Sequence, residues 1–212
     1  MYIFAGLGNP GARYAKNRHN IGYMTAERIA EQHTFESFRN RSKLSAAVAE
    51  GRIGDAHVAL LKPTTFMNDS GHAIGSVLRY YKIEPSDLFV FYDELDLAPG
   101  KFRVRFGGGT AGHKGMKSAR NHIGANFWRI RMGIGHPGNR DLVSDYVLSD
   151  FTKAEMIWVE KLVDAAAEAL PLLLAKDKAD YMSRVAVLAP APKPLKPHPA
   201  AADTAAAKPE LP

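Results

Sequence analysis

The 212-residue chain contains no cysteine. This absence excludes a disulfide framework, metal sites built from thiolates and a cysteine nucleophile. It also suits a reducing compartment.

Long hydrophobic runs are missing as well. No segment approaches the roughly 20 apolar residues that a membrane-spanning helix needs. The first residues, MYIFAGLGNPG, lack the charged segment and long apolar segment of a secretory signal. We therefore expect a cytoplasmic protein without a membrane partner.

Several catalytic patterns are absent too. The eight histidines never form HExxH or a comparable cluster, so no metal site is expected. The lack of GxSxG argues against a serine hydrolase of the common α/β type. GLGNPG (6–11) has dinucleotide-fingerprint spacing, but Pro10-Gly11 resembles a turn and helical periodicity starts only near Ile21. A nucleotide-dependent enzyme is thus a remote alternative, and we expect no cofactor.

What is present indicates one globular domain. Hydrophobic residues make up 46% of the chain, enough for one buried core at this length. Hydrophobic spacing predicts strands over 2–5, 45–53, 57–61, 88–92, 101–106 and 128–135. It predicts helices over 20–33, 69–81, 116–123, 152–170 and 178–188, the long one opened by a Thr152/Glu155 capping box. Their alternation predicts an α/β fold with a largely parallel or mixed sheet.

The composition changes at Ala189. Residues 189–212 are mostly Ala, Pro and Lys with almost no large apolar side chain. Such a segment cannot bury enough surface to offset the entropy of ordering, so we predict a disordered tail after a domain over 1–188.

The chain is basic, with 28 Lys and Arg against 22 acids and a formal net charge of +6. This surplus is compatible with a polyanionic partner, although many basic enzymes never bind nucleic acid. Lys101, Arg103 and Arg105 share one face of a strand by their period-two spacing. They form either a phosphate-binding patch or a solvated face.

One histidine and one aspartate are candidate catalytic residues. Asp93 follows the apolar run FVFY, at the carboxyl end of a strand, where α/β folds place their sites. His19 precedes the first helix, and a histidine held by a carboxylate is a competent general base. The competing interpretations are a structural histidine and a turn or cap aspartate.

Two other segments attract attention. In PTTFMN (63–68), Asn68 offers hydrogen bonds while Phe66 and Met67 are able to pack on a ligand, unless the segment is only a turn before a helix. GGGTAGHKG (107–115) is not a P-loop, because His113 separates Gly112 from Lys114 and no Ser or Thr follows. Taken alone, this loop is best interpreted as a surface loop.

Together these segments resemble the bacterial peptidyl-tRNA hydrolase family. The matching stretches lie in family order across most of 1–188, and the tail has no part in the match. They are GLGNPGARYAKNRHNIG (6–22), KPTTFMNDSG (62–71), FYDELDLAPG (91–100), GGGTAGHKG (107–115) and RIRMGIGHPG (129–138).

The resemblance implies a single compact domain with a twisted mixed sheet flanked by helices. It implies a cytoplasmic, usually monomeric enzyme that needs no metal and cuts the ester joining a peptide to tRNA. His19 would be the base and Asp93 would support it. Asn9 would help distinguish N-blocked peptidyl groups, and Tyr14, Phe66 and Asn68 would contact the substrate around the tRNA 3′ end.

The chain departs from the family at two positions in the glycine-rich loop. Thr110 and Lys114 stand where members commonly carry His and Asn. Because a charged lysine only donates hydrogen bonds, any accepting role of the amide is lost, and Lys114 becomes a candidate phosphate ligand. The main alternative is an RNA-binding relative without catalysis, which would have no need for an oriented base.

Overall fold

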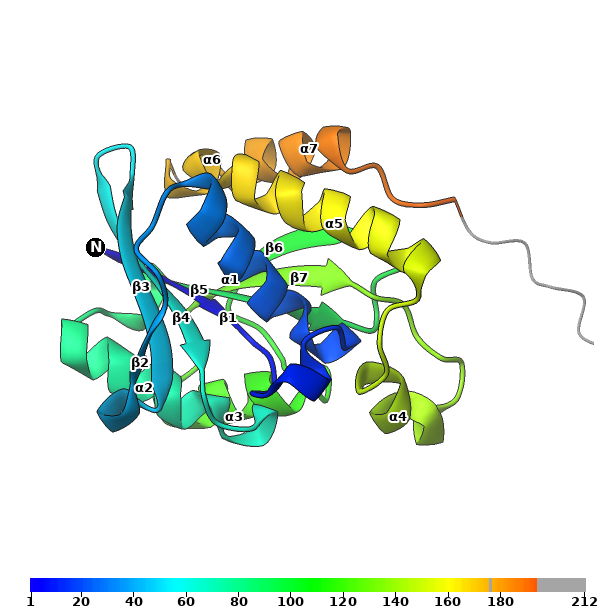
Figure 1. Cartoon of the computed structure of the whole chain (residues 1–212), viewed down its shortest axis with the longest axis horizontal. Helices are drawn as coiled ribbons and strands as arrows, with labels where there is room; N and C mark the ends of the chain where they lie inside the picture. The colour runs from blue at the N-terminus through cyan, green and yellow to red at the C-terminus, as the bar shows by residue number, and fades with distance from the viewer. Residues whose placement is uncertain (176, 194–212) are drawn as a thin grey trace, which may run out of the picture.

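The computed structural model describes residues 1–175 and 177–193. In that part of the chain, a sheet of seven strands has the order β2-β3-β4-β1-β5-β7-β6 (Figure 1). β1 pairs in parallel with β4 and β5, and β5 pairs in parallel with β7. The β2–β3, β3–β4 and β6–β7 pairs are antiparallel, so the expectation of a mixed α/β sheet is confirmed. The strands are β1 (Tyr2–Gly6), β2 (Arg39–Arg41), β3 (Ala46–Ile53), β4 (Ala56–Pro63), β5 (Leu88–Glu94), β6 (Phe102–Phe106) and β7 (Trp128–Gly133).

Helices cover both faces of the sheet (Figure 1). α2 and α3 pack against each other on one face, and α1 packs against α5 on the other, with α7 beside α5. Each face therefore has its own hydrophobic cluster. The helices are α1 (Ile21–Gln32), α2 (Ser70–Tyr81), α3 (Lys114–Ile123), α4 (Val143–Val147), α5 (Lys153–Glu168), α6 (Leu170–Leu174) and α7 (Lys178–Leu188).

The local signals account for several of these boundaries. In α2, Ile74 and Val77 are fully buried, as their helical spacing predicts. The helix ends where Lys82 adopts a left-handed conformation, with φ of 55°. At the start of α5, both hydrogen bonds of the Thr152/Glu155 capping box are present.

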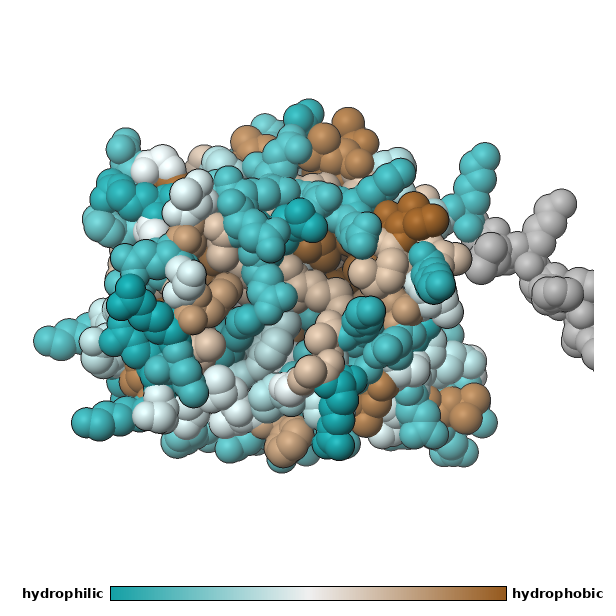
Figure 2. Space-filling model, in the orientation of Figure 1, coloured by the Kyte–Doolittle hydropathy of each residue, from teal (hydrophilic) through white to brown (hydrophobic). Residues whose placement is uncertain are grey.

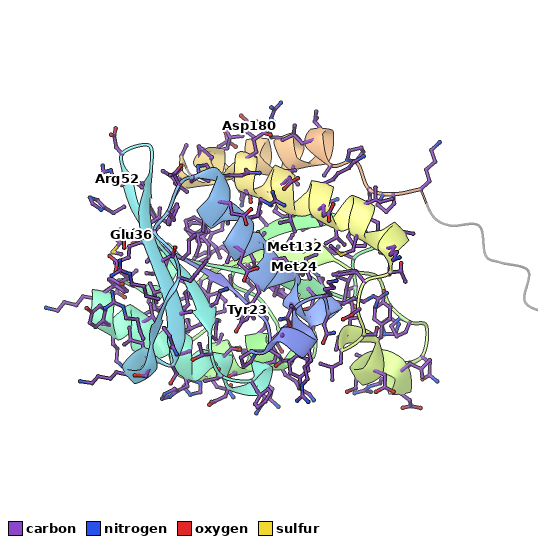
Figure 3. All side chains as sticks on the ribbon, viewed as in Figure 1. Tyr23, Met24, Glu36, Arg52, Met132 and Asp180 are labelled. Carbon is purple, nitrogen blue, oxygen red and sulfur yellow. The ribbon has the colours of Figure 1, made fainter. Side chains whose placement is uncertain are left out.

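Two short elements were not predicted from the sequence. β2 was not predicted because its three residues are all exposed and show no hydrophobic alternation. α4 has five residues and only Val147 is buried, too little for a helical period. In α1, Met24 packs against the core, on the side of the helix towards Met132 (Figure 3). The Nε atom of Arg28 lies 3.0 Å from Asp164 of α5.

The packed chain extends slightly past residue 188. Ala189 is 5% exposed, and Pro192 lies so close to Gly100 that a side chain on Gly100 would overlap it. The rest of the proposed tail, 194–212, lies outside the described residues. On the face shown in Figure 2, hydrophilic side chains dominate and the hydrophobic ones form separate small patches. No helix among the described residues combines the length and apolar character needed to cross a membrane.

Candidate active site

A cleft of about 810 Å³ opens beyond the carboxyl ends of β1 and β5. All eight residues singled out as catalytic or substrate-binding line it, although they come from four separate segments. They are Asn9, Tyr14, His19, Phe66, Met67, Asn68, Asp93 and Lys114. The position of the cleft agrees with the rule that open α/β sheets place ligands at the carboxyl ends of their strands.

The chain leaving β1 is held tightly against β5. The amide of Leu7 donates to the carbonyl of Phe91 at 3.0 Å, which continues the parallel pairing beyond β1. A side chain on Gly22 would overlap that same carbonyl, so the start of α1 must be glycine to approach this closely. This contact brings the short 3-10 helix Arg18–Asn20 beside the end of β5.

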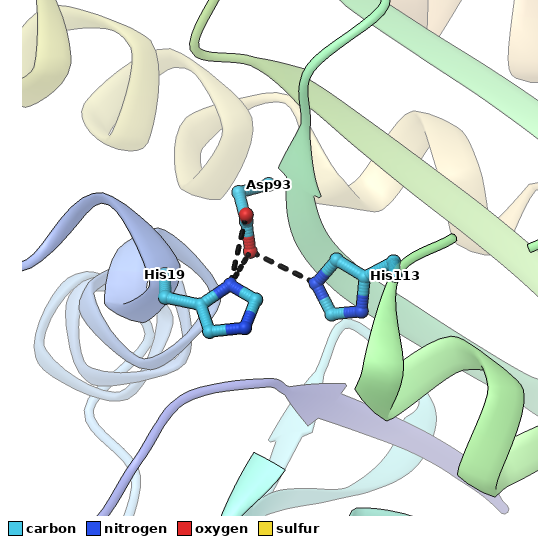
Figure 4. Close-up of side chains that lie close together, drawn as sticks. All are labelled: His19, Asp93 and His113. Atoms are coloured by element: carbon cyan, nitrogen blue, oxygen red, sulfur yellow. Dashed lines mark hydrogen bonds and ion pairs between the residues drawn. The ribbon is translucent and has the colours of Figure 1, made fainter. Parts of the chain in front are cut away.

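His19 and Asp93 meet at the floor of the cleft (Figure 4). The Nδ1 atom of His19 lies 2.9 Å from both carboxylate oxygens of Asp93. Asp93 is 2% exposed and His19 is 8% exposed, and both line the cleft. The carboxylate is thus shielded from water while the imidazole remains reachable from the cleft.

A second histidine, which sequence reasoning missed, binds the same carboxylate. Nε2 of His113 lies 3.0 Å from Oδ1 of Asp93, the oxygen that His19 also contacts, and the two imidazole rings lie side by side with their centroids 4.8 Å apart (Figure 4). The glycine-rich loop is therefore part of the site rather than a plain surface loop. The signal in the sequence was a histidine immediately before a predicted helix, which we considered only as an interruption of a P-loop pattern.

The hydrogen bonds fix the protonation pattern of both rings. The backbone N–H of Met116 donates to Nδ1 of His113 at 3.2 Å, so in the neutral ring Nε2 carries the proton and donates it to Asp93. In His19, Nδ1 faces the carboxylate and carries the proton. The lone pair of His19 is then on Nε2, which makes this atom the free base of the site.

These contacts keep Asp93 ionised. Burial by itself would raise the pKa of the Asp93 carboxyl, but the facing imidazoles of His19 and His113 and their hydrogen bonds hold it well below its usual range. Asp93 therefore stays an acceptor for both rings at any pH at which the protein works.

The three side chains are also close enough to suggest a metal site, with candidate ligand atoms within 4.8 Å of one another. The hydrogen bonds do not fit that interpretation. A metal needs the lone pair of His113 Nε2, yet the Met116 N–H occupies Nδ1 and leaves the proton on Nε2. The donor set matches a carboxylate with two hydrogen-bonded histidines.

The amide of Asn9 has a fixed orientation. Its Oδ1 accepts from the backbone N–H of Met67 at 2.8 Å, and its main chain makes two hydrogen bonds with the Asn20 side chain. Within residues 1–175 and 177–193, no partner is found for the Nδ2 group of Asn9. That N–H₂ group is the part of Asn9 left to bind a ligand in the cleft.

The mouth of the cleft is aromatic. Phe66 is 55% exposed, and its ring meets that of Tyr14 edge to face at 6.4 Å. Asn68 is exposed, while Met67 is buried against Gly115 at the start of α3, next to Lys114. An exposed aromatic pair next to an amide suits a planar ligand such as a nucleobase.

The far wall comes from the segment around α4, which the sequence did not predict. Val143, Ser144, Val147 and Leu148 line the cleft there. Arg18 joins this wall to His19, because its Nη1 and Nη2 atoms bind Ser149 and Glu155 at 2.7 Å. The wall and the proposed base are therefore held together by one buried arginine.

A basic face lies on β6 and β7. Arg103 and Arg105 are exposed, and Arg131 pairs with Glu94 at 2.9 Å. Arg129, on the same face of β7 as Arg131, is only 1% exposed. Strand alternation gives the face on which a side chain lies but not what covers it.

Comparison with known proteins shows the family of this chain. The family model described as peptidyl-tRNA hydrolase matches residues 3–193. The chain belongs to the peptidyl-tRNA hydrolase family. Its relatives include the peptidyl-tRNA hydrolase of Dinoroseobacter shibae, 51% identical over 91% of this chain and 81% of the relative. That of Parvibaculum lavamentivorans is 51% identical over 92% and 95% of the two chains.

Solved structures of peptidyl-tRNA hydrolases share the fold. The crystal structure of the Acinetobacter baumannii enzyme superposes with a TM-score of 0.84 at 36% identity, over 90% of this chain and 97% of that one. A complex of peptidyl-tRNA hydrolase with N-propanol gives a TM-score of 0.85 at the same identity. The resemblance drawn from the five sequence stretches is thus confirmed for the fold and the family.

Proposed function

We propose that this protein hydrolyses the ester bond between a peptide and tRNA, with His19 as general base and Asp93 as its orienting carboxylate. The observation that carries the proposal is the contact of His19 Nδ1 with both Asp93 oxygens, which leaves Nε2 free at the cleft. A binding protein without catalysis would not need this arrangement, which disfavours the alternative.

The reaction needs one base and no covalent intermediate. His19 Nε2 removes a proton from water, and the hydroxide oxygen attacks the ester carbonyl carbon to give a tetrahedral oxyanion. As the oxyanion collapses, the bond from that carbon to the ribose oxygen breaks, and the proton on Nε2 passes to the leaving ribose oxygen. Asp93 stabilises the transient imidazolium, and such base catalysis typically contributes about 10²–10⁴-fold.

Other cleft residues supply binding. The free Nδ2 group of Asn9 is a suitable donor to a carbonyl of the N-blocked peptide or to the oxyanion. Tyr14 and Phe66 offer rings for the terminal base of the tRNA, with Asn68 to bind its polar edge and Met67 supporting the floor. Lys114, at the start of α3, lines the cleft and is the candidate ligand for a phosphate.

The basic face supplies contacts farther along the tRNA. Arg103 and Arg105 point from the same side of β6, and Arg131 lies across from Arg103 on β7. Such a row suits the phosphates of a double-stranded acceptor stem. Because peptidyl-tRNA arises during translation, the proposed function includes action in the cytoplasm. The proposed active form is the monomer.

Hydrolysis of N-acetylaminoacyl-tRNA by wild type and His19→Ala tests the proposal. We expect a loss of two or more orders of magnitude in kcat with tRNA binding largely kept, since the general-base contribution is about 10²–10⁴-fold. His57→Ala is the matched control, because His57 is exposed at the start of β4, at the opposite end of the parallel strands from the cleft. Equal rates for wild type and His19→Ala would refute the role of His19.

A further inference from the structure

Arg18, the residue before the proposed base, is a buried cation at a junction of three segments. Its Nη1 atom donates to the carbonyl of Asp150 and to the hydroxyl of Ser149, each at 2.7 Å, just beyond the end of α4. Its Nη2 atom donates to the two carboxylate oxygens of Glu155, at 2.8 and 2.7 Å, at the start of α5. The Arg18 side chain is 8% exposed. Such charge-assisted hydrogen bonds from a rigid fork of N–H groups fix the relative positions of their partners.

Helix α4 is too short to hold its own position. Helices shorter than about 12 residues are marginal in water, and α4 has five, of which Val147 is the buried one. Ser149 links its last turn to Arg18, because the Ser149 hydroxyl accepts from Arg18 and donates to the carbonyl of Tyr146 at 2.7 Å. The Tyr146 ring also lies 4.5 Å from the guanidinium carbon of Arg18. The position of α4 is therefore set by tertiary contacts, and Arg18 makes several of them.

The segment that leads to His19 is paired with the same stretch of chain. The Arg18 N–H donates to the carbonyl of Ser149 at 3.1 Å, and Asn17 and Asp150 form an antiparallel bridge. The Nδ2 group of Asn17 also donates to Oδ1 of Asp150 at 2.7 Å. The Cα atom of His19 follows that of Arg18 at about 3.8 Å across one peptide bond. A shift of the chain that follows α4 is therefore passed directly to the proposed base.

Three apolar side chains, here called the α4 wall, face the cleft from this side. They are Val143, Val147 and Leu148, and Leu148 is 43% exposed. α4 contacts the 3-10 helix that carries His19, so the α4 wall lies beside the base. The aromatic pair at the mouth and Lys114 suit the base and phosphates of an RNA end instead. In an aminoacyl ester of tRNA, the part left to contact an apolar surface is the side chain of the esterified amino acid.

We propose that Arg18 is a positioning residue of the reaction. It holds the α4 wall at a fixed distance from His19, and so determines how well the side chain of the esterified amino acid is bound beside the base. A larger apolar side chain covers more of the wall and is bound more tightly, because more apolar surface leaves water. This inference rests on the proposed function.

The test compares an N-acetylleucyl ester with an N-acetylglycyl ester of the same tRNA, because glycine has no side chain to contact the wall. We expect the wild type to have a severalfold higher kcat/KM for the leucyl ester, mainly through a lower KM. Arg18→Lys keeps the charge but not the fork of N–H groups, so it should lose most of this preference. A merely structural defect would lower the activity on both esters alike and leave their ratio unchanged.

Arg28→Lys is the matched control, because Arg28 also binds a carboxylate of α5, but at Asp164, nearer the other end of that helix. It should keep the wild-type preference. Leu148→Ala removes apolar surface from the wall without changing Arg18, and it should lower the preference as well. Ser149→Ala removes one acceptor of Arg18, should lower the preference less, and serves if Arg18→Lys does not fold. A wild-type preference in Leu148→Ala, or in the folded variant that weakens the Arg18 contacts, would overturn the inference.

A second readout is independent of catalysis. In 3′-(N-acetylleucylamino)-3′-deoxyadenosine and its glycyl counterpart, an amide replaces the ester, so these compounds report binding alone. The leucyl compound should bind the wild type more tightly and shift the methyl NMR signals of Val143 and Val147, and Arg18→Lys should reduce the difference in affinity. A wild type that cleaves both esters yet binds the two compounds equally would refute the inference alone, whereas absence of any hydrolysis would refute the proposed function.

Discussion

Replacing Asp93 by Asn changes one atom of the site and tests the proposed protonation pattern directly. Oδ1 accepts hydrogen bonds from both His19 and His113, whereas Oδ2 meets only His19. The amide oxygen of Asn therefore takes the Oδ1 position, and its N–H₂ group comes 2.9 Å from His19 Nδ1. This donor competes with the retained oxygen for Nδ1, so the imidazole proton is no longer held on Nδ1 alone, and the tautomer with the proton on Nε2, where the base must be free, becomes populated.

The expected loss of rate follows from the general-base contribution that the substitution removes. General-base catalysis contributes about 10²–10⁴-fold, which corresponds to about 3–5 kcal/mol of activation free energy. The Asp93→Asn variant also loses the negative charge that stabilises the imidazolium. We therefore expect kcat/KM to fall by two to four orders of magnitude, with KM much less changed.

The assay is the pH dependence of kcat/KM for N-acetylaminoacyl-tRNA. The rate of the variant should lie well below that of the wild type at every pH, because the imidazolium formed in the reaction has lost its carboxylate. Asp55→Asn, in the exposed β3–β4 turn, is the matched control and should behave as the wild type. If Asp93→Asn stays within about tenfold of the wild type at every pH, the imidazole of His19 is not oriented as argued.

Three other changes have defined outcomes. His113→Ala removes one hydrogen bond to Asp93 and the cap of α3, so kcat should fall, and the free energy of unfolding in urea should drop by about 1 kcal/mol; unchanged values of both would contradict its role. Lys114→Asn should reduce the slope of log K against log salt for tRNA binding by about 1 if the lysine binds a phosphate, and an equal slope would remove that contact. Burial alone would raise the pKa of Glu155, but hydrogen bonds from Thr152 and Arg18 lower it, so its contribution to stability is present above the unfolded-state pKa and lost as pH falls. The free energy of unfolding of Glu155→Gln should therefore depend less on acid pH than that of the wild type. Urea titrations between pH 3 and 7, roughly the range around a carboxyl pKa, measure this dependence.

The sequence located the proposed base and its carboxylate because both follow from simple rules. A buried strand ending in Asp93 places that residue at the carboxyl edge of a sheet, where β1 delivers the segment with His19. These two positions depend only on the pairing of neighbouring parallel strands. The helices and strands with clear periodicity were predictable for the same reason, since each is specified by residues within one segment.

The parts that escaped prediction depend on contacts between distant segments. α4 is too short to show a period, and its position is set by Arg18, about 130 residues earlier in the chain, binding Ser149 and Glu155. Arg129 has the alternation of an exposed strand residue, yet the glycine-rich loop covers it. Neither of these contacts can be recognised from the local amino-acid sequence.

The contacts of His113 show that interactions between distant segments set the protonation pattern of the site as well as its geometry. The three side chains at the floor of the cleft would satisfy the distances of a metal site. The difference lies in one backbone N–H at the start of α3, which occupies Nδ1 of His113 and makes Nε2 a donor. The start of α3 also fixes the end of the glycine-rich loop. The hydrogen bond from the Met116 N–H to His113 Nδ1 therefore sets both the position of the loop and the position of the proton on His113. A substitution that shifted the start of α3 should therefore alter catalysis even without touching His19 or Asp93.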